Sequence, residues 1–458
     1  MSENALRVAV VGAGPSGFYA TDQLLKAGFE VDLLEILPTP FGLVRAGVAP
    51  DHPKIKSVTR VYEKTANHPG FRFFGGVELG GHVSRQDLLD RYHAVLYAVG
   101  TASDNKLGIP GEDRPGSHGA LEFVAWYNGH PDYADHEFDL SATRAVVIGN
   151  GNVAVDVARM LVLDPEEMAV TDTADHAIAP LGSASVHEVI VLGRRGPAQA
   201  AFTTPELREL GELTRADIIV DPQDLVLDDY SEKWLEEEGE PTNKRNVELM
   251  REYATRDAHG HERRVELRFL RSPLEILGDD ETGAVTGVRI GINKIVDGRA
   301  VLTGEEEIIS CGLVIRSIGY RGTPLAGIPF DERRGLISNL GGRVLSHEGE
   351  HEVGEYVVGW VKRGPSGVIG TNKKDATDTV ARILEDREAG KLNTPKNPDA
   401  EDVPKFLAEV CPSVVTWEGW RSIDVHETGL GEPQGRPRVK LVRTGEMLDI
   451  ASAALSQP

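Results

Sequence analysis

The sequence predicts an α/β protein with two Rossmann-like dinucleotide-binding domains, of which the first is discontinuous. Two glycine-rich turns carry this prediction, because each follows a short apolar strand and opens a helix, an arrangement that places a pyrophosphate at a helix N-terminus. The turns run from Gly12 to Gly17 and from Gly149 to Ala154. A third observation places the crossings between the domains: two further apolar strands both end in glycine, at Gly100 and Gly319.

The first turn belongs to a dinucleotide fingerprint that spans Arg7 to Glu35. Gly12 permits the tight turn, Gly14 lets the backbone approach a pyrophosphate, and Gly17 lets the helix pack close to the strand. A second apolar strand ends at Glu35, where a carboxylate can accept hydrogen bonds from ribose hydroxyls. The sequence therefore predicts a bound dinucleotide whose ribose lies near Glu35.

The composition argues against several classes of protein. The chain has 458 residues, enough for two or three domains, and a formal net charge of -23, which argues against a nucleic-acid binder. Its only two cysteines, Cys311 and Cys411, are far apart, so we expect reduced thiols, no metal site and no iron–sulfur cluster within the chain. There is no apolar run near ~20 residues and no room for a targeting peptide before the first strand, so we expect a cytoplasmic protein.

The second turn is expected to bind a different nucleotide. In it Ala154 replaces the third glycine, which the fingerprint allows because only close helix packing is required there. The next apolar strand, Val186 to Leu192, stops at Arg194 and Arg195 rather than at an acid. Two guanidiniums can pair with a ribose 2′-phosphate through forked hydrogen bonds, so this site is expected to take NADPH. A solvated arginine pair at a strand end is the alternative.

Two further stretches carry candidate functional groups. A helix is predicted to start near Thr203, with Thr204 as its cap. Glu206 in its first turn either interacts favourably with the helix dipole or faces a nicotinamide. The segment from Gly359 to Asn372 predicts a strand end, an aromatic side chain and a glycine-rich turn before a helix from about Lys373 to Glu388. The amides at that helix start would favour negative charge on a ligand ring such as a flavin, unless the helix is simply capped beside a core tryptophan.

Together these motifs resemble those of the adrenodoxin reductase-like NADPH-ferredoxin reductases, including the short bacterial members. The resemblance runs from Val8 to Ile450, and its most specific motifs are Phe41 to Arg45, Ala49 to Pro53, Gly149 to Ala154, Gly193 to Pro197 with Phe202-Thr203, Gly359-Trp360 and Arg363 to Asn372. It implies a glutathione reductase-like three-layer architecture. FAD would occupy a domain of residues 1–103 and 320–458, and NADPH a domain of residues 104–319.

The resemblance also implies roles for individual residues. The expected FAD contacts are Gly12, Gly14, Ser16, Gly17, Glu35, Leu43, Val83, Trp360, Gly367, Val368 and Ile369. The expected NADPH contacts are Gly149, Asn150, Gly151, Asn152, Val153, Arg194, Arg195, Glu206 and Gly367. His52 and Glu206 look like the family's pair beside the flavin and the nicotinamide, where they would position the rings and tune charge, since hydride transfer needs little acid–base chemistry.

The implied activity is transfer of a hydride from NADPH to FAD N5, followed by transfer of single electrons to a separate ferredoxin. No ferredoxin domain is fused to the chain, so we expect the electron acceptor to be another protein. We also expect the reductase to be a monomer. An acidic ferredoxin would need a local positive surface on this acidic protein. The candidates for that surface are Lys54, Lys56, Arg208, Lys244 and Arg245.

Three other classes of function stay open from the sequence. A flavin disulfide or thioredoxin reductase needs a redox-active cysteine pair, which Cys311 and Cys411 do not supply at a recognisable spacing. A flavin monooxygenase is compatible with the fold, although no further motif supports it. A nucleotide-sensing scaffold would bind both cofactors without turnover.

Overall fold

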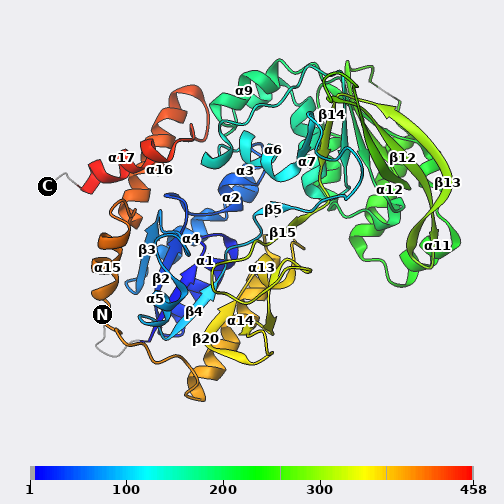
Figure 1. Ribbon diagram of the computed structural model, residues 1–458. Helices are drawn as coiled ribbons and strands as arrows, with labels where there is room; N and C mark the ends of the chain where they lie inside the picture. The colour runs from blue at the N-terminus through cyan, green and yellow to red at the C-terminus, as the bar shows by residue number, and fades with distance from the viewer. Residues whose placement is uncertain (1–5, 258, 368, 456–458) are drawn as a thin grey trace. The chain divides into compact units, whose positions relative to one another are not determined.

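The computed structural model describes residues 6–257, 259–367 and 369–455. The chain divides into two compact units, one of Met1–Ser103 with Tyr320–Pro458 and one of Asp104–Gly319 (Figure 1). The chain leaves the first unit at β5 (Ser103–Asp104) and re-enters it at β15 (Tyr320–Arg321), and these two short strands pair with each other. The first unit is therefore built from both ends of the chain.

The first unit is organised around a seven-stranded sheet in which five neighbouring strands are parallel. In sheet order the strands are β18 (Asn339–Leu340), β19 (Arg343–Leu345), β20 (His351–Val357), β4 (Ala94–Tyr97), β1 (Arg7–Val11), β2 (Glu30–Glu35) and β3 (Phe71–Gly75). Strand β20, from late in the sequence, pairs with β4 from its beginning. This pairing brings the segment after β20 to the same sheet edge as the first glycine-rich turn, because the carboxyl ends of parallel strands lie together.

Helices from both parts of the chain cover this sheet. They are α1 (Pro15–Lys26), α2 (Leu43–Ala46), α3 (Pro53–Lys56), α4 (Thr59–Ala66), α5 (Arg85–Leu89), α13 (Trp360–Arg363), α14 (Thr371–Glu388), α15 (Asp402–Val410), α16 (Trp417–Gly431) and α17 (Thr444–Leu455). Helices α1 and α14 pack against each other. In the core between α1 and α4, the Phe18 and Tyr62 rings stack at 4.8 Å. Trp420 is 1% exposed and Trp417 packs on the same cluster, so both tryptophans belong to the apolar core of this unit.

The second unit contains a parallel sheet of six strands and an antiparallel sheet of three. The parallel sheet has the order β6 (Ser117–Gly119), β14 (Leu313–Arg316), β7 (Arg144–Ile148), β8 (Glu188–Leu192), β10 (Arg263–Arg268) and β9 (Ala216–Val220), and the antiparallel sheet consists of β11 (Arg271–Gly278), β12 (Val285–Val296) and β13 (Arg299–Ser310). Its helices are α6 (Ala120–Tyr127), α7 (Asn152–Val162), α8 (Pro165–Ala169), α9 (Asp175–Gly182), α10 (Thr204–Leu210), α11 (Asp229–Glu237) and α12 (Pro241–Thr255).

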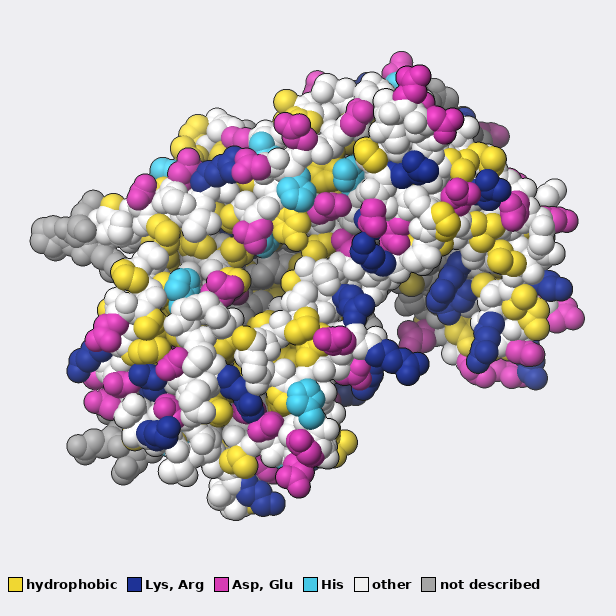
Figure 2. Space-filling view, viewed as in Figure 1, with side chains coloured by type: hydrophobic (Ala, Val, Ile, Leu, Met, Phe, Trp, Pro, Cys, Tyr) yellow, Lys and Arg dark blue, Asp and Glu magenta, His cyan; other side chains and the backbone are white. Residues whose placement is uncertain are grey.

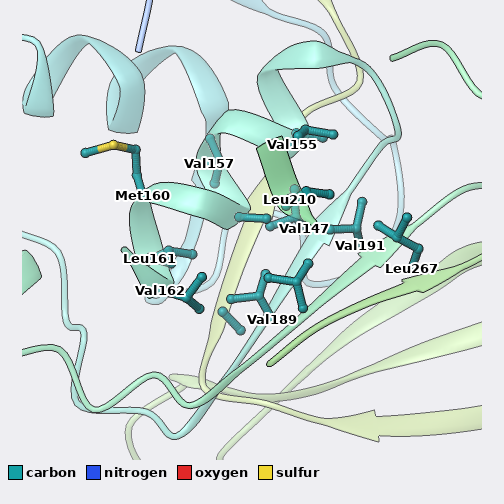
Figure 3. Close-up of a cluster of buried hydrophobic side chains, with 14 of the residues drawn as sticks. Val147, Val155, Val157, Met160, Leu161, Val162, Val189, Val191, Leu210 and Leu267 are labelled. Atoms are coloured by element: carbon teal, nitrogen blue, oxygen red, sulfur yellow. The ribbon is translucent and has the colours of Figure 1, made fainter. Parts of the chain in front are cut away.

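The core of the second unit lies between its parallel sheet and helices α7 and α10. Val147, Val189 and Leu267 project from three neighbouring strands, and Leu161 of α7 and Leu210 of α10 are packed in the same cluster (Figure 3). These side chains are at most 1% exposed. Their burial fixes α7, and with it the second glycine-rich turn, at the carboxyl end of β7.

The basic segment from Lys54 to Lys64 is divided between two helices, α3 and α4. Ser57 lies between them, and its hydroxyl donates a hydrogen bond of 2.6 Å to the Lys54 carbonyl. Such local side-chain bonds compete with the helical ladder and favour helix ends.

Candidate functional site

The first glycine-rich turn has the local geometry of a phosphate-binding turn. Gly12 has a φ of +107°, and a Cβ atom there would lie 2.5 Å from the Ala98 carbonyl oxygen, so only glycine fits. A Cβ atom at Gly17 would collide with the Gly12 carbonyl, whereas one at Gly14 would meet nothing within 4 Å. The first and third glycines are therefore needed for packing, and the middle one leaves open space beside the backbone.

Helix α1 begins directly after this turn without a side-chain cap. Its N-cap residue is Gly14, and no side-chain cap is present among the residues that the structure describes. Uncapped amides at the start of a 12-residue helix favour a bound anion. Glu35, 9% exposed at the end of β2, accepts hydrogen bonds from the N–H groups of Ala13 at 2.7 Å and Leu37 at 3.2 Å. Burial raises the pKa of Glu35, while these backbone donors oppose the rise.

The motif around Leu43 packs directly on this turn. The Phe41 N–H donates to the Ala13 carbonyl at 2.8 Å, and a Cβ atom at Gly42 would lie 3.0 Å from the Gly14 Cα atom. The structure therefore brings Leu43, the first residue of α2, to the edge of the turn. His52 precedes α3 in the same unit, is 6% exposed, and has its Nε2 atom 4.0 Å from Asp51 Oδ1.

Val83 has a different environment from the other predicted FAD contacts. Its side chain is 2% exposed and packs in an apolar cluster with Val77 and Leu88. Its N–H donates to the Glu78 carbonyl, and its own carbonyl accepts from Gly80. The side chain of Val83 thus belongs to the core of the unit.

The segment after β20 meets the first turn through Ser16. The Ser16 hydroxyl donates to Asn372 Oδ1 at 3.0 Å, and a Cβ atom at Gly359 would collide with the same hydroxyl. Helix α14 begins at Thr371 with Gly370 as its N-cap and no side-chain cap, two residues before the predicted start. Gly367 has a φ of +80° and Ile369 packs on the neighbouring core. The predicted contact Val368 lies outside the described residues.

Trp360 presents an unsatisfied donor in this region. It is the first residue of α13, and its indole nitrogen is buried without a hydrogen-bond partner among the described residues. A buried indole N–H normally finds a partner, so this atom suits a ligand that supplies an acceptor. Asp375 of α14 fixes the turn before it, because its Oδ2 accepts from the Gly359 N–H at 2.6 Å and its Oδ1 pairs with Lys362 at 2.7 Å. Sequence analysis missed Asp375, since nothing in the local pattern distinguishes it from a solvated helix residue.

The second glycine-rich turn repeats this geometry in the second unit. Gly149 has a φ of +129° and no room for a Cβ atom against the Ser317 carbonyl, while a Cβ atom at Gly151 would meet nothing within 4 Å. Helix α7 begins at Asn152 with Gly151 as an uncapped N-cap residue. Val153 packs partly on the core below the turn.

Two polar contacts join this turn to the segment that carries Glu206. The Asn152 Oδ1 atom accepts from the Thr203 N–H at 2.8 Å, and the Asn150 carbonyl accepts from the Ala201 N–H at 3.1 Å. The Thr203 hydroxyl in turn donates to the Glu206 carboxylate, which is in the first turn of α10 and 8% exposed. The structure therefore places Glu206 beside the second turn.

The predicted cap of α10 was wrong by one residue. Its N-cap residue is Thr203 rather than Thr204, and the helix has no side-chain cap. The Thr204 hydroxyl is used elsewhere, since it donates to Asn246 Oδ1 at 2.7 Å.

Arg194 and Arg195 follow β8 and are both exposed. In the described parts of the chain neither guanidinium has an ion-pair partner, although the protein carries a net charge of -23. Arg144 and Arg264 of the same unit, by contrast, both pair with Glu188. Two unpaired guanidiniums directly after β8 fit a doubly charged phosphate.

The cysteines provide no dithiol centre. Cys311 lies in the second unit and Cys411 in the first, and both are free and buried. Burial raises the pKa of Cys311 to about 12, so its thiol stays protonated. The described residues contain no group of three or more His, Cys, Asp and Glu side chains arranged to hold a metal ion. None of the helices described here is long and apolar enough to cross a membrane.

The basic residues considered for docking a ferredoxin differ in whether nearby acidic or carbonyl groups bind their positive charges. Arg245 pairs with Glu248 at 2.9 Å and Glu252 at 3.2 Å, both on α12, and Lys244 Nζ donates to the Glu236 carbonyl. Lys54 and Arg208 are exposed. On the face drawn in Figure 2, basic and acidic side chains are interspersed. The cationic character of α12 is therefore weaker than the sequence suggests.

Comparisons with known proteins agree with this geometry. The profile of the pyridine nucleotide-disulphide oxidoreductases matches residues 6–349. NADPH-ferredoxin reductase FprA of Mycobacterium tuberculosis is 49% identical, over 97% of this chain and 98% of that protein. The mitochondrial NADPH:adrenodoxin oxidoreductase of Arabidopsis thaliana is 41% identical, over 98% of this chain and 96% of that protein. A solved structure of Mycobacterium tuberculosis FprA in complex with NADPH has a TM-score of 0.91 at 48% identity, and covers 98% of this chain and 100% of that one.

These matches extend over nearly the whole chain and confirm the predicted α/β fold class with its two parallel sheets. The chain belongs to the pyridine nucleotide-disulphide oxidoreductases and, within them, to the adrenodoxin reductase-like NADPH-ferredoxin reductase family.

Proposed function

We propose that this chain is an FAD-dependent ferredoxin–NADP reductase, which takes a hydride from NADPH and passes single electrons to a separate ferredoxin-type iron–sulfur protein. One observation carries the proposal: the two dinucleotide turns are followed by opposite charges. Strand β2, which follows the first turn, ends at Glu35, and this carboxylate suits ribose hydroxyls. Strand β8, which follows the second turn, leads into the unpaired Arg194 and Arg195, and these guanidiniums suit a 2′-phosphate. Two different dinucleotides therefore fit the two units.

The first unit, residues 1–103 and 320–458, would hold FAD. The open space at Gly14 and the uncapped start of α1 fit a pyrophosphate, and Glu35 is placed for a ribose. The partnerless indole N–H of Trp360 and the uncapped start of α14 fit the polar edge of an isoalloxazine ring. Ser16, Gly12, Gly17, Leu43, Val83, Gly367, Val368 and Ile369 complete the proposed set of contacts.

The second unit, residues 104–319, would hold NADPH. Gly149, Asn150, Gly151, Asn152 and Val153 would surround the pyrophosphate at the start of α7, and Arg194 and Arg195 would bind the 2′-phosphate. We also assign Gly367 to the nicotinamide side of the site.

The chain's own residues bind, orient and tune rather than exchange protons with the substrate. When bound, FAD supplies the redox chemistry, as a hydride acceptor at N5 and a donor of single electrons. The positive end of the α14 dipole would stabilise negative charge on the ring. We assign His52, buried beside Asp51, and Glu206, hydrogen-bonded by Thr203, to positioning and charge tuning of the flavin and the nicotinamide.

We further propose that the reductase works as a cytoplasmic monomer. The free, buried thiols of Cys311 and Cys411 are in keeping with a reducing compartment. Light scattering during gel filtration should give one chain of 49.7 kDa. A stable dimer peak would refute the monomer.

The proposed activity can be tested on the purified holoprotein. Its visible spectrum should show an oxidised flavin that is bleached by NADPH without oxygen, and a ferredoxin added with cytochrome c should restore the colour while cytochrome c is reduced. Protein that stays colourless after reconstitution with FAD would contradict the proposal. A bound flavin that NADPH does not bleach, with no electron transfer to any acceptor, would favour a nucleotide-binding scaffold. Rapid oxygen consumption dependent on an organic substrate would favour a monooxygenase.

A further inference from the structure

In the loop that carries Arg194 and Arg195, three successive carbonyl groups accept hydrogen bonds. The Gly193 carbonyl accepts from the Arg271 N–H at 3.0 Å, and the Arg195 carbonyl accepts from the Leu270 N–H at 3.1 Å. Between them, the Arg194 carbonyl accepts from Asn293 Nδ2 at 2.8 Å. Of these three bonds only the middle one comes from a side chain, so only that one can be removed by substitution.

Asn293 is built into the structure at this point. It lies on β12, is 4% exposed, and its Nδ2 atom also donates to Ser272 Oγ at 2.8 Å. The pairing of β12 with β13 shifts register between Gly291 and Asn293, and such bulges re-aim a side chain. Its backbone N–H donates at 2.8 Å to the carbonyl of Leu270.

Leu270 shows how closely the loop and Asn293 are connected. It has a φ of +55°, a left-handed conformation that a leucine rarely adopts and that the surrounding bonds must maintain. Its carbonyl is held by Asn293, and its N–H holds the Arg195 carbonyl. Asn293 therefore holds the Arg194 peptide directly and the Arg195 peptide through Leu270. The two guanidiniums themselves remain exposed and unpaired.

We propose that Asn293 is the positioning residue that sets the preference for a 2′-phosphorylated nucleotide. This inference rests on the proposed function, in which Arg194 and Arg195 bind the 2′-phosphate of NADPH. By fixing the Arg194 peptide, the amide restricts the directions of both guanidiniums before the ligand arrives. A long, flexible side chain loses conformational freedom when it binds, and a preorganised backbone reduces that loss. Without the amide, recognition of the 2′-phosphate should weaken, while the rest of the nucleotide binds as before.

The test uses Asn293→Leu, which keeps the size of the side chain and removes its donor, in the FAD-loaded protein. Titration calorimetry would measure the dissociation constants of 2′-phospho-AMP and AMP, and steady-state assays would compare KM for NADPH and NADH. We expect the affinity for 2′-phospho-AMP to fall roughly tenfold, the effect of one lost hydrogen bond with its preorganisation. We expect AMP binding, KM for NADH and kcat to stay near their values in the unaltered protein.

Asn128→Leu is the matched control. Asn128 is a buried amide of the same unit, 1% exposed, whose Nδ2 donates to the Val124 carbonyl rather than to the arginine loop. It should lower the thermal midpoint without changing the ratio of the two dissociation constants. If Asn293→Leu does not fold, Asn293→Ser, which is smaller and cannot span the same distance, gives the same comparison.

The outcomes separate this inference from the function on which it rests. An unaltered protein that binds 2′-phospho-AMP and AMP equally would overturn the NADPH assignment itself. A clear preference in the unaltered protein that survives in the Asn293 variant would overturn only the role of Asn293. Equal weakening of both ligands in the variant would also overturn that role, because it would indicate general damage to the site.

Discussion

The Ser16 hydroxyl donates a hydrogen bond to Asn372 Oδ1 across 356 positions of the sequence. Arg363 donates to the same oxygen atom at 2.9 Å, so Asn372 joins the first glycine-rich turn to the glycine-rich segment before α14. Both partners are buried, Ser16 being 7% exposed and Asn372 also 7%. At the proposed FAD site, the Asn372 Oδ1 atom thus accepts hydrogen bonds from two donors in distant segments of the chain.

We expect Asn372→Leu to weaken FAD retention, because it leaves the buried Ser16 hydroxyl and one half-buried Arg363 donor without their shared acceptor. An unsatisfied buried group costs about 1 to 3 kcal/mol. Dialysis against guanidinium chloride followed by flavin fluorescence would measure the loss. Ser16→Ala should have a smaller effect, and adding it to Asn372→Leu should cost little more, since both variants remove the same bond. Fully additive effects would show that the two residues act independently.

The arginine pair gives a prediction on nucleotide choice. Replacing both Arg194 and Arg195 by alanine should weaken NADPH binding by roughly 2 to 4 kcal/mol, since charge-assisted bonds to the phosphate are lost, while NADH binding changes little. Steady-state KM values for the two nucleotides would measure this. Arg299→Ala, at an exposed arginine of the same unit, is the control and should leave both KM values unchanged. An equal loss for NADPH and NADH would refute the assignment of the 2′-phosphate site.

The carboxylate of Glu206 is expected to affect hydride transfer more than nucleotide affinity. Glu206→Gln keeps an acceptor for the Thr203 hydroxyl but removes the charge beside the second turn. We expect the rate of flavin reduction in stopped-flow experiments to fall roughly tenfold through loss of ring positioning and charge tuning. Thr203→Val is the companion variant, since it keeps the charge and removes its hydrogen-bond donor. A change in NADPH dissociation constant with an unaltered reduction rate would assign Glu206 to binding alone.

Much of this architecture is predictable because its signals are local. The spacing of Gly12, Gly14 and Gly17, and the charge at the end of the following strand, act within about 20 residues of each other. Strand β11 has no clear signal in the sequence because Pro273 interrupts the strand pattern, and the structure places that proline at an irregular position of the pairing with β12. The contacts of Asn293 with the arginine loop were not predictable, because Asn293 and Arg194 are 99 positions apart and no local sequence pattern links them.

A buried ion cluster in the first unit provides a stability test that is separate from cofactor binding. Glu427 of α16 is 0% exposed and pairs with Arg45 and with Arg438, the latter at 3.0 Å, while the Leu441 N–H donates to it at 2.8 Å. Burial by itself would raise the pKa of Glu427, but the attraction of the two guanidiniums outweighs it and the pKa is lowered. Removing the charge would leave Arg45 without its carboxylate partner among the described residues and Arg438 with Asp424 alone, at 2.8 Å.

We therefore expect Glu427→Gln to destabilise the protein by about 3 to 5 kcal/mol, the cost of breaking a buried pair from one side. Urea unfolding near pH 7 would measure it, with Glu418→Gln, an exposed acid on the same helix, as the control. Because the folded pKa is lowered, the stabilisation is complete above the unfolded pKa of about 4.3 and is lost as the pH falls through the lower folded value. The difference between the two proteins should accordingly shrink below about pH 4.3, and a difference independent of pH down to strongly acidic conditions would show that the Glu427 charge contributes nothing.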